Sequence, residues 1–204
     1  MFMAKLSDDI KEEEKFYRDG LERIRKYYSL PKNKREKETG LKDPPHEILM
    51  KRAGYLICSG LEDIKNWQNV EEEPIGYILI GIGTEILLKA IILKEDPKYF
   101  VENIRGGRTL SFKQCIGKLI DILPENFTLK EARRIKEVLK LIHLKRNNLV
   151  HLGFHQMHHY REDYHIASTL EFLFKQFFEK GTEQITVKLK KFKENAKIIS
   201  GIGL

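Results

Sequence analysis

Apolar side chains recur at three- and four-residue steps through most of this chain, which is the spacing of helices that bury one face. All six prolines fall where such helices would begin or end, and none follows position 124. The predicted helices cover residues 7–28, 45–61, 74–94, 111–123, 128–152 and 163–180. Outside the C-terminal tail, no segment shows the alternation expected of a half-buried strand. We therefore predict an all-α fold, an antiparallel four-helix bundle with an extension at each end.

The bundle is predicted to be one domain. The predicted division is residues 1–44 as an N-terminal helical extension with a basic linker, 45–180 as the helical bundle, and 181–204 as a short basic C-terminal tail. The polar segment 32–42 is predicted to be a linker or loop, and residues 97–108 are predicted to connect two helices. The stretch from Ile185 to Ile199 suits either a strand or a helix, so its structure is left open.

Local signals mark several helix ends. Ser7, followed by two aspartates, predicts a capped start for the first helix. Ser111 with Gln114 has the spacing of a capping box, in which two side chains satisfy each other's backbone N–H groups. Thr128 with Glu131 is a second capping box. It opens the helix that carries the most informative residues.

The stretch from Ile75 to Leu93 is apolar enough to require a membrane test. Glu85 and Lys89 lie near its middle, and each charge at the centre of a bilayer costs roughly 2.5–3.5 kcal/mol. We therefore predict a buried bundle helix and no membrane partner.

Two cysteines, Cys58 and Cys115, have no paired spacing, so neither a disulfide framework nor a cysteine-based zinc site is predicted. Residues 1–9 lack the apolar run and cleavage site of a secretory signal. These features favour a cytoplasmic protein.

Positive charge is concentrated in one part of the chain. The formal net charge is +7, which favours an acidic partner, most commonly a nucleic acid. Seven cations against two glutamates lie in residues 128–151: Lys130, Arg133, Arg134, Lys136, Lys140, Lys145 and Arg146. The basic excess therefore lies in the segment that holds the candidate motif, and an acidic partner is expected there.

The candidate chemistry centres on the segment from Arg146 to His151. Arg146 falls on the apolar stripe of its helix, where a buried arginine requires an acidic partner or a ligand. Asn147 precedes His151 by one turn, so its amide can fix the orientation of the imidazole. Five residues leave Arg146 and His151 offset by about 140° on a helix. They are therefore expected to flank a cleft, most easily one between two copies of the helix.

Glu85 and Lys89 form a second pair, one turn apart within the apolar helix. Taken alone, they would be an ordinary i,i+4 ion pair at a helix edge. An arginine and a histidine five residues apart also occur by chance in many helices. The combination of the two pairs carries the functional interpretation.

Glu85-x-x-x-Lys89 followed by Arg146-Asn147-x-x-x-His151 resembles the bipartite motif of HEPN domains, the helical nuclease modules of many prokaryotic toxin and RNA-processing systems. The surrounding segments GTEILLKAIIL and KRNNLVHLGF fit the same family. The resemblance covers about residues 45–180.

The resemblance implies a homodimer whose two motifs face each other across a two-fold axis. It also implies metal-independent RNA cleavage by attack of the 2′-hydroxyl on the adjacent phosphate. Arg146 would stabilise the charged transition state, His151 would act as acid or base, and Asn147 would orient it. Lys89 would add charge near the phosphate, and Glu85 would hold Lys89 or Arg146. No cofactor is expected.

The other histidines leave a metal-binding alternative open. Five histidines crowd into fifteen residues: His151, His155, His158, His159 and His165. The first three can line one helical face and bind zinc or nickel, although Gly153 interrupts that helix and no fourth ligand is evident. The simpler interpretation is a polar helix end that faces solvent or RNA, with His143 and His46 as structural or surface residues.

Two functions therefore follow from the sequence. The first is an endoribonuclease, as a toxin with an antitoxin partner or as a defence nuclease. The second is a non-catalytic HEPN-like module that binds or dimerises with RNA, a nucleotide or a nucleotidyltransferase.

Overall fold

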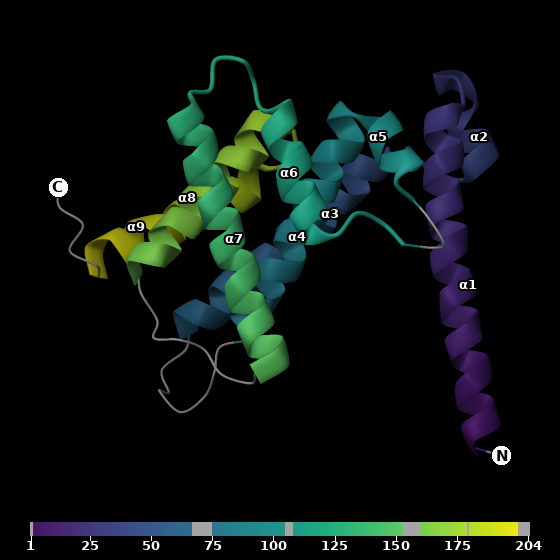
Figure 1. The fold of residues 1–204 in the computed structure, drawn as a ribbon, viewed down its shortest axis with the longest axis horizontal. Coiled ribbons are helices and arrows are strands. Elements are labelled where there is room, and N and C mark those ends of the chain that lie inside the picture. Colours follow the sequence, from purple (N-terminus) through teal and green to yellow (C-terminus); the bar gives the residue numbers. More distant parts are fainter. Residues whose placement is uncertain (1, 67–74, 105–107, 153–159, 179, 200–204) are drawn as a thin grey trace.

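The computed structural model describes residues 2–66, 75–104, 108–152, 160–178 and 180–199, which are almost entirely helical (Figure 1). The helices are α1 (Phe2–Ser29), a 3₁₀ turn (Lys32–Lys34), α2 (Arg35–Thr39), α3 (Pro45–Asn66), α4 (Gly76–Glu95), α5 (Pro97–Glu102), α6 (Phe112–Ile122), α7 (Leu129–Leu152), α8 (Tyr160–Phe177) and α9 (Glu183–Ile199). No β-strand occurs within the described ranges. The predicted all-α class is therefore confirmed.

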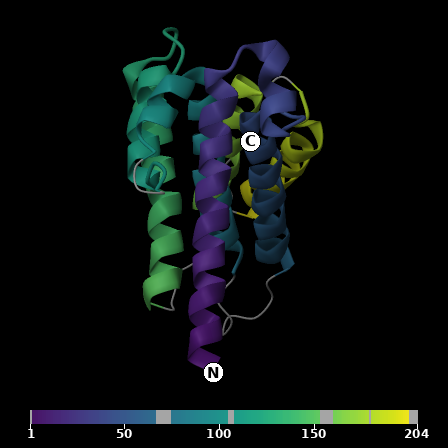
Figure 2. The same cartoon turned by 90° about the vertical axis from the view of Figure 1, so that its right-hand side faces the viewer.

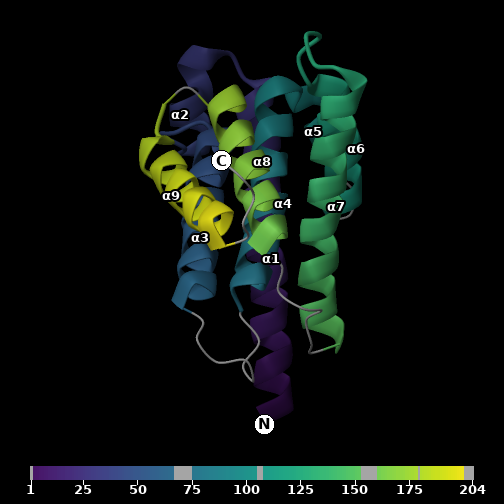
Figure 3. The same ribbon diagram turned by 90° about the vertical axis from the view of Figure 1, so that its left-hand side faces the viewer.

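Helix α4 lies at the centre of the molecule. It contacts α3, α5, α6 and α7, and apolar side chains on all its sides are buried, among them Leu87, Leu88, Ile91 and Leu93. Helix α3 runs antiparallel to it. In Figure 3, α9 lies beside α3, α6 and α7 lie on the other side of α4, and α8 runs between α9 and α7. The apolar residues of all these helices form one continuous core.

Helix α4 is long and apolar enough to cross a membrane by length and composition alone. In the structure, 67% of its most apolar 18-residue stretch is buried by other helices. A central core helix accounts for this composition, as the sequence predicted.

The structure changes the predicted start of the first helix and settles the form of the stretch from Ile185 to Ile199. Helix α1 begins at Phe2, so Ser7 lies inside the helix and not at its predicted start. The N-terminal part of α1 extends beyond the other helices (Figures 1 and 2). At the other end, the undecided tail forms helix α9, which packs on α8 and α3 and buries Leu189 and Ala196. Of the two structures left open for Ile185 to Ile199, the helix is the one that forms, and it packs on the core.

Two segments expected to be irregular also contain helix. The linker 32–42 holds the 3₁₀ turn and α2, which ends at Gly40 in the left-handed conformation that glycine adopts readily. The connection 97–108 begins with α5, whose first turn is capped by the Asp96 side chain. Short helices of this kind carry too few residues for a periodic pattern to be recognised.

The two predicted capping boxes are confirmed. The backbone N–H of Gln114 donates to Ser111 Oγ, and Gln114 Oε1 accepts from the backbone N–H of Ser111. Thr128 and Glu131 make the same reciprocal pair at the start of α7. These caps fix where α6 and α7 begin, and so which of their residues face α4.

Candidate functional site

Helix α4 places Glu85 and Lys89 at its edge, one turn apart. Lys89 Nζ lies 2.7 Å from Glu85 Oε1, and the side chains of Lys89 and Glu85 are only 18% and 20% exposed. Both side chains are therefore largely removed from solvent. The pair is thus held more rigidly than an exposed i,i+4 pair would be.

Helix α7 brings Arg146 to the same carboxylate. Arg146 Nη1 donates to Glu85 Oε2 at 2.7 Å. Its aliphatic stem crosses α4 at Gly81, where a Cβ would come within 2.6 Å of Arg146 Cβ and 2.8 Å of Cδ. A glycine at this crossing is therefore required for the arginine to lie as it does.

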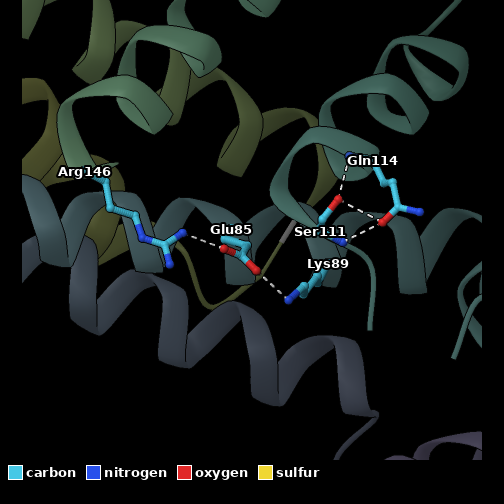
Figure 4. Close-up of polar contacts among 5 residues, drawn as sticks. All are labelled: Glu85, Lys89, Ser111, Gln114 and Arg146. Carbon is cyan, nitrogen blue, oxygen red and sulfur yellow. Dashed lines mark hydrogen bonds and ion pairs between the residues drawn. The ribbon is translucent and has the colours of Figure 1, made fainter. Parts of the chain in front are cut away.

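Glu85 is the centre of a three-residue network (Figure 4). One carboxylate oxygen faces Lys89 and the other faces Arg146, so two cations share one anion. Burial raises the pKa of Glu85, but the hydrogen bonds and charges of Lys89 and Arg146 outweigh it and hold the pKa below its ordinary value. The glutamate is therefore ionised at neutral pH, and the network carries one net positive charge.

Asn147 contacts His143, for which the sequence predicts a structural or surface role. Its Nδ2 lies 3.1 Å from Nε2 of His143, one turn earlier on α7. The His143 ring stacks on Phe112 of α6 with 4.8 Å between ring centres. Burial and the positive charge of Arg146 lower the pKa of His143. His143 is thus a neutral imidazole within the candidate site, clamped between two helices.

The spacing around Asn147 explains why its contact with His143 could not be predicted. His143 and His151 lie four residues before and after it, so both are one turn away. Periodicity alone cannot choose between them. His151 falls within α7, but its side chain lies outside the part of the chain that the structure describes, so its orientation by Asn147 stays a prediction.

The metal-binding alternative falls on the same undescribed part. His155, His158 and His159 lie outside the described residues, as does the His151 side chain. Within the described ranges, no group of three His, Cys, Asp or Glu side chains comes together as a metal site requires.

A second polar cluster, not predicted from the sequence, lies beside Arg146. Lys145 is buried, with its Nζ 2.7 Å from Glu162 Oε2 and 4.6 Å from the centre of the Tyr77 ring. Tyr77 in turn donates a 2.6 Å hydrogen bond to Asp163. The cluster ties the first turn of α8 to α4 and α7, because a buried charge is costly unless it stays paired. It therefore fixes the position of α7 next to Arg146.

The arrangement suits binding of a phosphate group. The Arg146 side chain is 27% exposed, so a ligand can reach it from solvent. A guanidinium offers a planar fork of donors that matches phosphate oxygens, and Glu85 uses one edge of it. Lys89 adds a second cation on the other side of Glu85.

Comparison with known protein families, curated proteins and solved structures found no match for this chain. The interpretation of the site therefore depends on its own residues and geometry.

Proposed function

We propose that the chain is a metal-independent endoribonuclease of the HEPN type, working as a homodimer around a four-helix unit of α3, α4, α7 and α8. The observation that carries the proposal is the contact of Glu85 with both Lys89 and Arg146. The two halves of the motif are 61 residues apart in sequence and meet at one carboxylate. The positive charge of the chain and of α7 gives further support.

In the proposed reaction, the 2′-hydroxyl oxygen of RNA attacks the adjacent phosphorus. The new bond closes a 2′,3′-cyclic phosphate while the bond from phosphorus to the 5′-oxygen breaks. One proton leaves the 2′-oxygen and one is gained by the departing 5′-oxygen. His151 moves a proton at one of these oxygens, because imidazole titrates near neutral pH and serves as acid or base.

The remaining residues provide charge and position. Arg146 stabilises the negative charge that builds up on the phosphate in the transition state. Lys89 adds positive charge nearby, and Glu85 holds both cations in place. Asn147 orients the His151 imidazole, and its own side chain contacts His143.

A non-catalytic binding or dimerisation module for RNA, a nucleotide or a nucleotidyltransferase partner is the second candidate. The same network favours it, since Glu85 engages both cations and compensates much of their charge. A toxin or defence role, with an antitoxin as partner, belongs to the first candidate only.

RNA cleavage in EDTA separates the two candidates. We expect the wild-type protein to cut RNA in EDTA, because the proposed chemistry uses side chains and no metal-bound water. Arg146→Ala or His151→Ala should reduce the rate by roughly a hundredfold or more. Both variants should still bind RNA, since most of the affinity comes from surrounding cations that contact phosphates.

Two controls sharpen this experiment. His155→Ala and His159→Ala remove neighbouring imidazoles and should have much smaller effects. A folded His151→Ala protein that cuts at the wild-type rate would overturn the mechanism and leave the binding module. Loss of cleavage in EDTA that zinc or nickel restores would move the chemistry to the histidine cluster.

A further inference from the structure

Three cationic or potentially cationic side chains converge where α7 passes α8. Arg134 of α7 places its Nη2 3.1 Å from Nδ1 of His165 on α8. Arg161 lies one turn before His165 on the same helix and is exposed. Its charge acts on the same imidazole. Two arginines thus flank one histidine on an accessible surface.

Carboxylates near this cluster in sequence are already engaged elsewhere. On α7, Glu131 caps the helix through Thr128, and Glu137 pairs with Lys140. On α8, Glu162 pairs with Lys145.

Asp163, also near the cluster in sequence, accepts a hydrogen bond from Tyr77. Within the described part of the chain, neither Arg134 nor Arg161 forms an ion pair. The positive charge of the cluster is therefore not balanced by a described carboxylate.

The contact between Arg134 and His165 also determines which ring nitrogen of His165 can donate a hydrogen bond. Because an arginine can only donate, Nδ1 of His165 accepts, and the ring proton of the neutral imidazole lies on Nε2. The ring is held edge to face against Tyr164, with 5.5 Å between centres. Burial and the two arginines lower the pKa of His165, which keeps it a neutral donor at neutral pH. The cluster thus offers two guanidinium groups and one imidazole N–H.

We propose that Arg134, Arg161 and His165 form a phosphate-binding site, separate from the Arg146 site. Two guanidinium groups without a carboxylate are a typical recognition set for a phosphate. Arg134 precedes Arg146 by twelve residues, about 18 Å along the helix axis. The site therefore holds a different phosphate from the one at Arg146.

The identity of this phosphate rests on the proposed function. If the chain is a ribonuclease, the cluster binds a backbone phosphate of the same RNA at a distance from the cleaved bond. Such a contact adds affinity and fixes the position of the strand, and carries no information on base sequence.

Binding can be measured without cleavage. A fully 2′-O-methylated RNA oligonucleotide has no attacking hydroxyl, so the proposed nuclease cannot cut it. For single strands, log K falls with log[salt] with a slope of about −0.7 for each phosphate contact. We expect Arg134→Gln and Arg161→Gln each to reduce the magnitude of this slope by up to about 0.7 and to weaken binding.

Arg52→Gln is the matched control, because Arg52 is exposed on α3 and its loss changes the net charge equally. A second readout follows the His165 ring signals by NMR during titration with inorganic phosphate. We expect a saturable shift in the wild type that the two arginine variants lose and Arg52→Gln keeps.

The outcomes distinguish the two proposals. The phosphate site would be overturned if both arginine variants showed the same salt slopes and the same His165 shifts as Arg52→Gln. If wild-type protein binds methylated RNA with the expected slopes but does not cut ordinary RNA, the site stands and the ribonuclease proposal fails. A His165 shift with inorganic phosphate but no RNA binding would keep the phosphate site and overturn its assignment to RNA.

Discussion

Gly81 determines where Arg146 can lie. The arginine stem rests on the glycine backbone, and this contact lets the guanidinium reach Glu85 on the same helix as Gly81. A side chain at position 81 would occupy the space of the arginine Cβ, Cγ and Cδ atoms. One small residue therefore controls the join between the two halves of the candidate site.

Gly81→Ala is expected to displace Arg146 and to lower the free energy of unfolding by about 1–3 kcal/mol, as overpacking does. If the proposed function holds, RNA cleavage falls as well. Denaturant unfolding measures the first effect. Gly117→Ala on α6 is the control, since a Cβ there meets nothing within 4 Å. An equal response of the two variants would contradict the steric role of Gly81.

The lowered pKa of Glu85 makes its contribution to stability depend on pH. The ionised carboxylate pairs with Lys89 and Arg146 in the folded state only. The stabilisation is therefore complete above the ordinary glutamate pKa of about 4.5 and is lost as pH falls through the lowered folded pKa.

Glu85→Gln should thus destabilise the protein by about 1–3 kcal/mol at neutral pH. The difference from wild type should shrink toward zero in acid, where Glu85 itself is protonated. Urea unfolding at several pH values gives the comparison. Glu194→Gln, which removes one exposed carboxylate, controls for net charge. A difference that stays constant with pH would show that the pairing adds nothing.

Helix α9 shows how an element without a decisive local pattern becomes part of the core. Leu189 is fully buried, and Ile185 covers Gly54 of α3. Lys188 bonds Glu62 of α3 at 2.6 Å, and Lys193 contacts the buried Glu171 of α8. The helix thus closes one side of the α3 and α8 layer.

Leu189→Ala is expected to cost about 2–5 kcal/mol of unfolding free energy, as a large cavity in a packed core does. Val187→Ala, two residues earlier and 65% exposed, should change it by less than about 0.5 kcal/mol. Thermal or urea unfolding distinguishes the two. Similar small effects would mean that the segment does not pack on the core.

In the whole molecule, helix α7, which carries Arg146 and Asn147, leaves some apolar side chains exposed to solvent. On α7, Leu144 and Val150 are each 52% exposed on either side of Arg146 and Asn147 in sequence. The proposed homodimer covers this region and brings two copies of the site together. Apolar side chains at such positions are the ones that an interface buries.

We expect a dimer at micromolar concentration by sedimentation or light scattering. Leu144→Lys should shift it toward monomer and reduce cleavage. Leu129→Lys, at the start of α7 and 92% exposed, should leave assembly unchanged. A wild-type protein that is strictly monomeric would contradict a site shared between two copies.

The sequence alone determined the helical class and the approximate bounds of the long helices, because apolar periodicity and capping boxes act within a few residues. It also identified Glu85, Lys89 and Arg146, because charges on an apolar stripe are costly and so stand out. Their meeting point was expected only through the family resemblance. The roles of these residues in RNA cleavage stay predictions.

Only the tertiary structure decided which partners meet. Asn147 had equivalent histidines one turn away on both sides, and packing of Phe112 on His143 provided a partner on one of them. Lys145 was counted with the other cations of residues 128–151, yet the approach of α8 buries it against Glu162. Helix α9 was ambiguous until α3 and α8 gave it a surface. In each case the energy comes from contacts between helices distant in sequence, which local patterns do not encode.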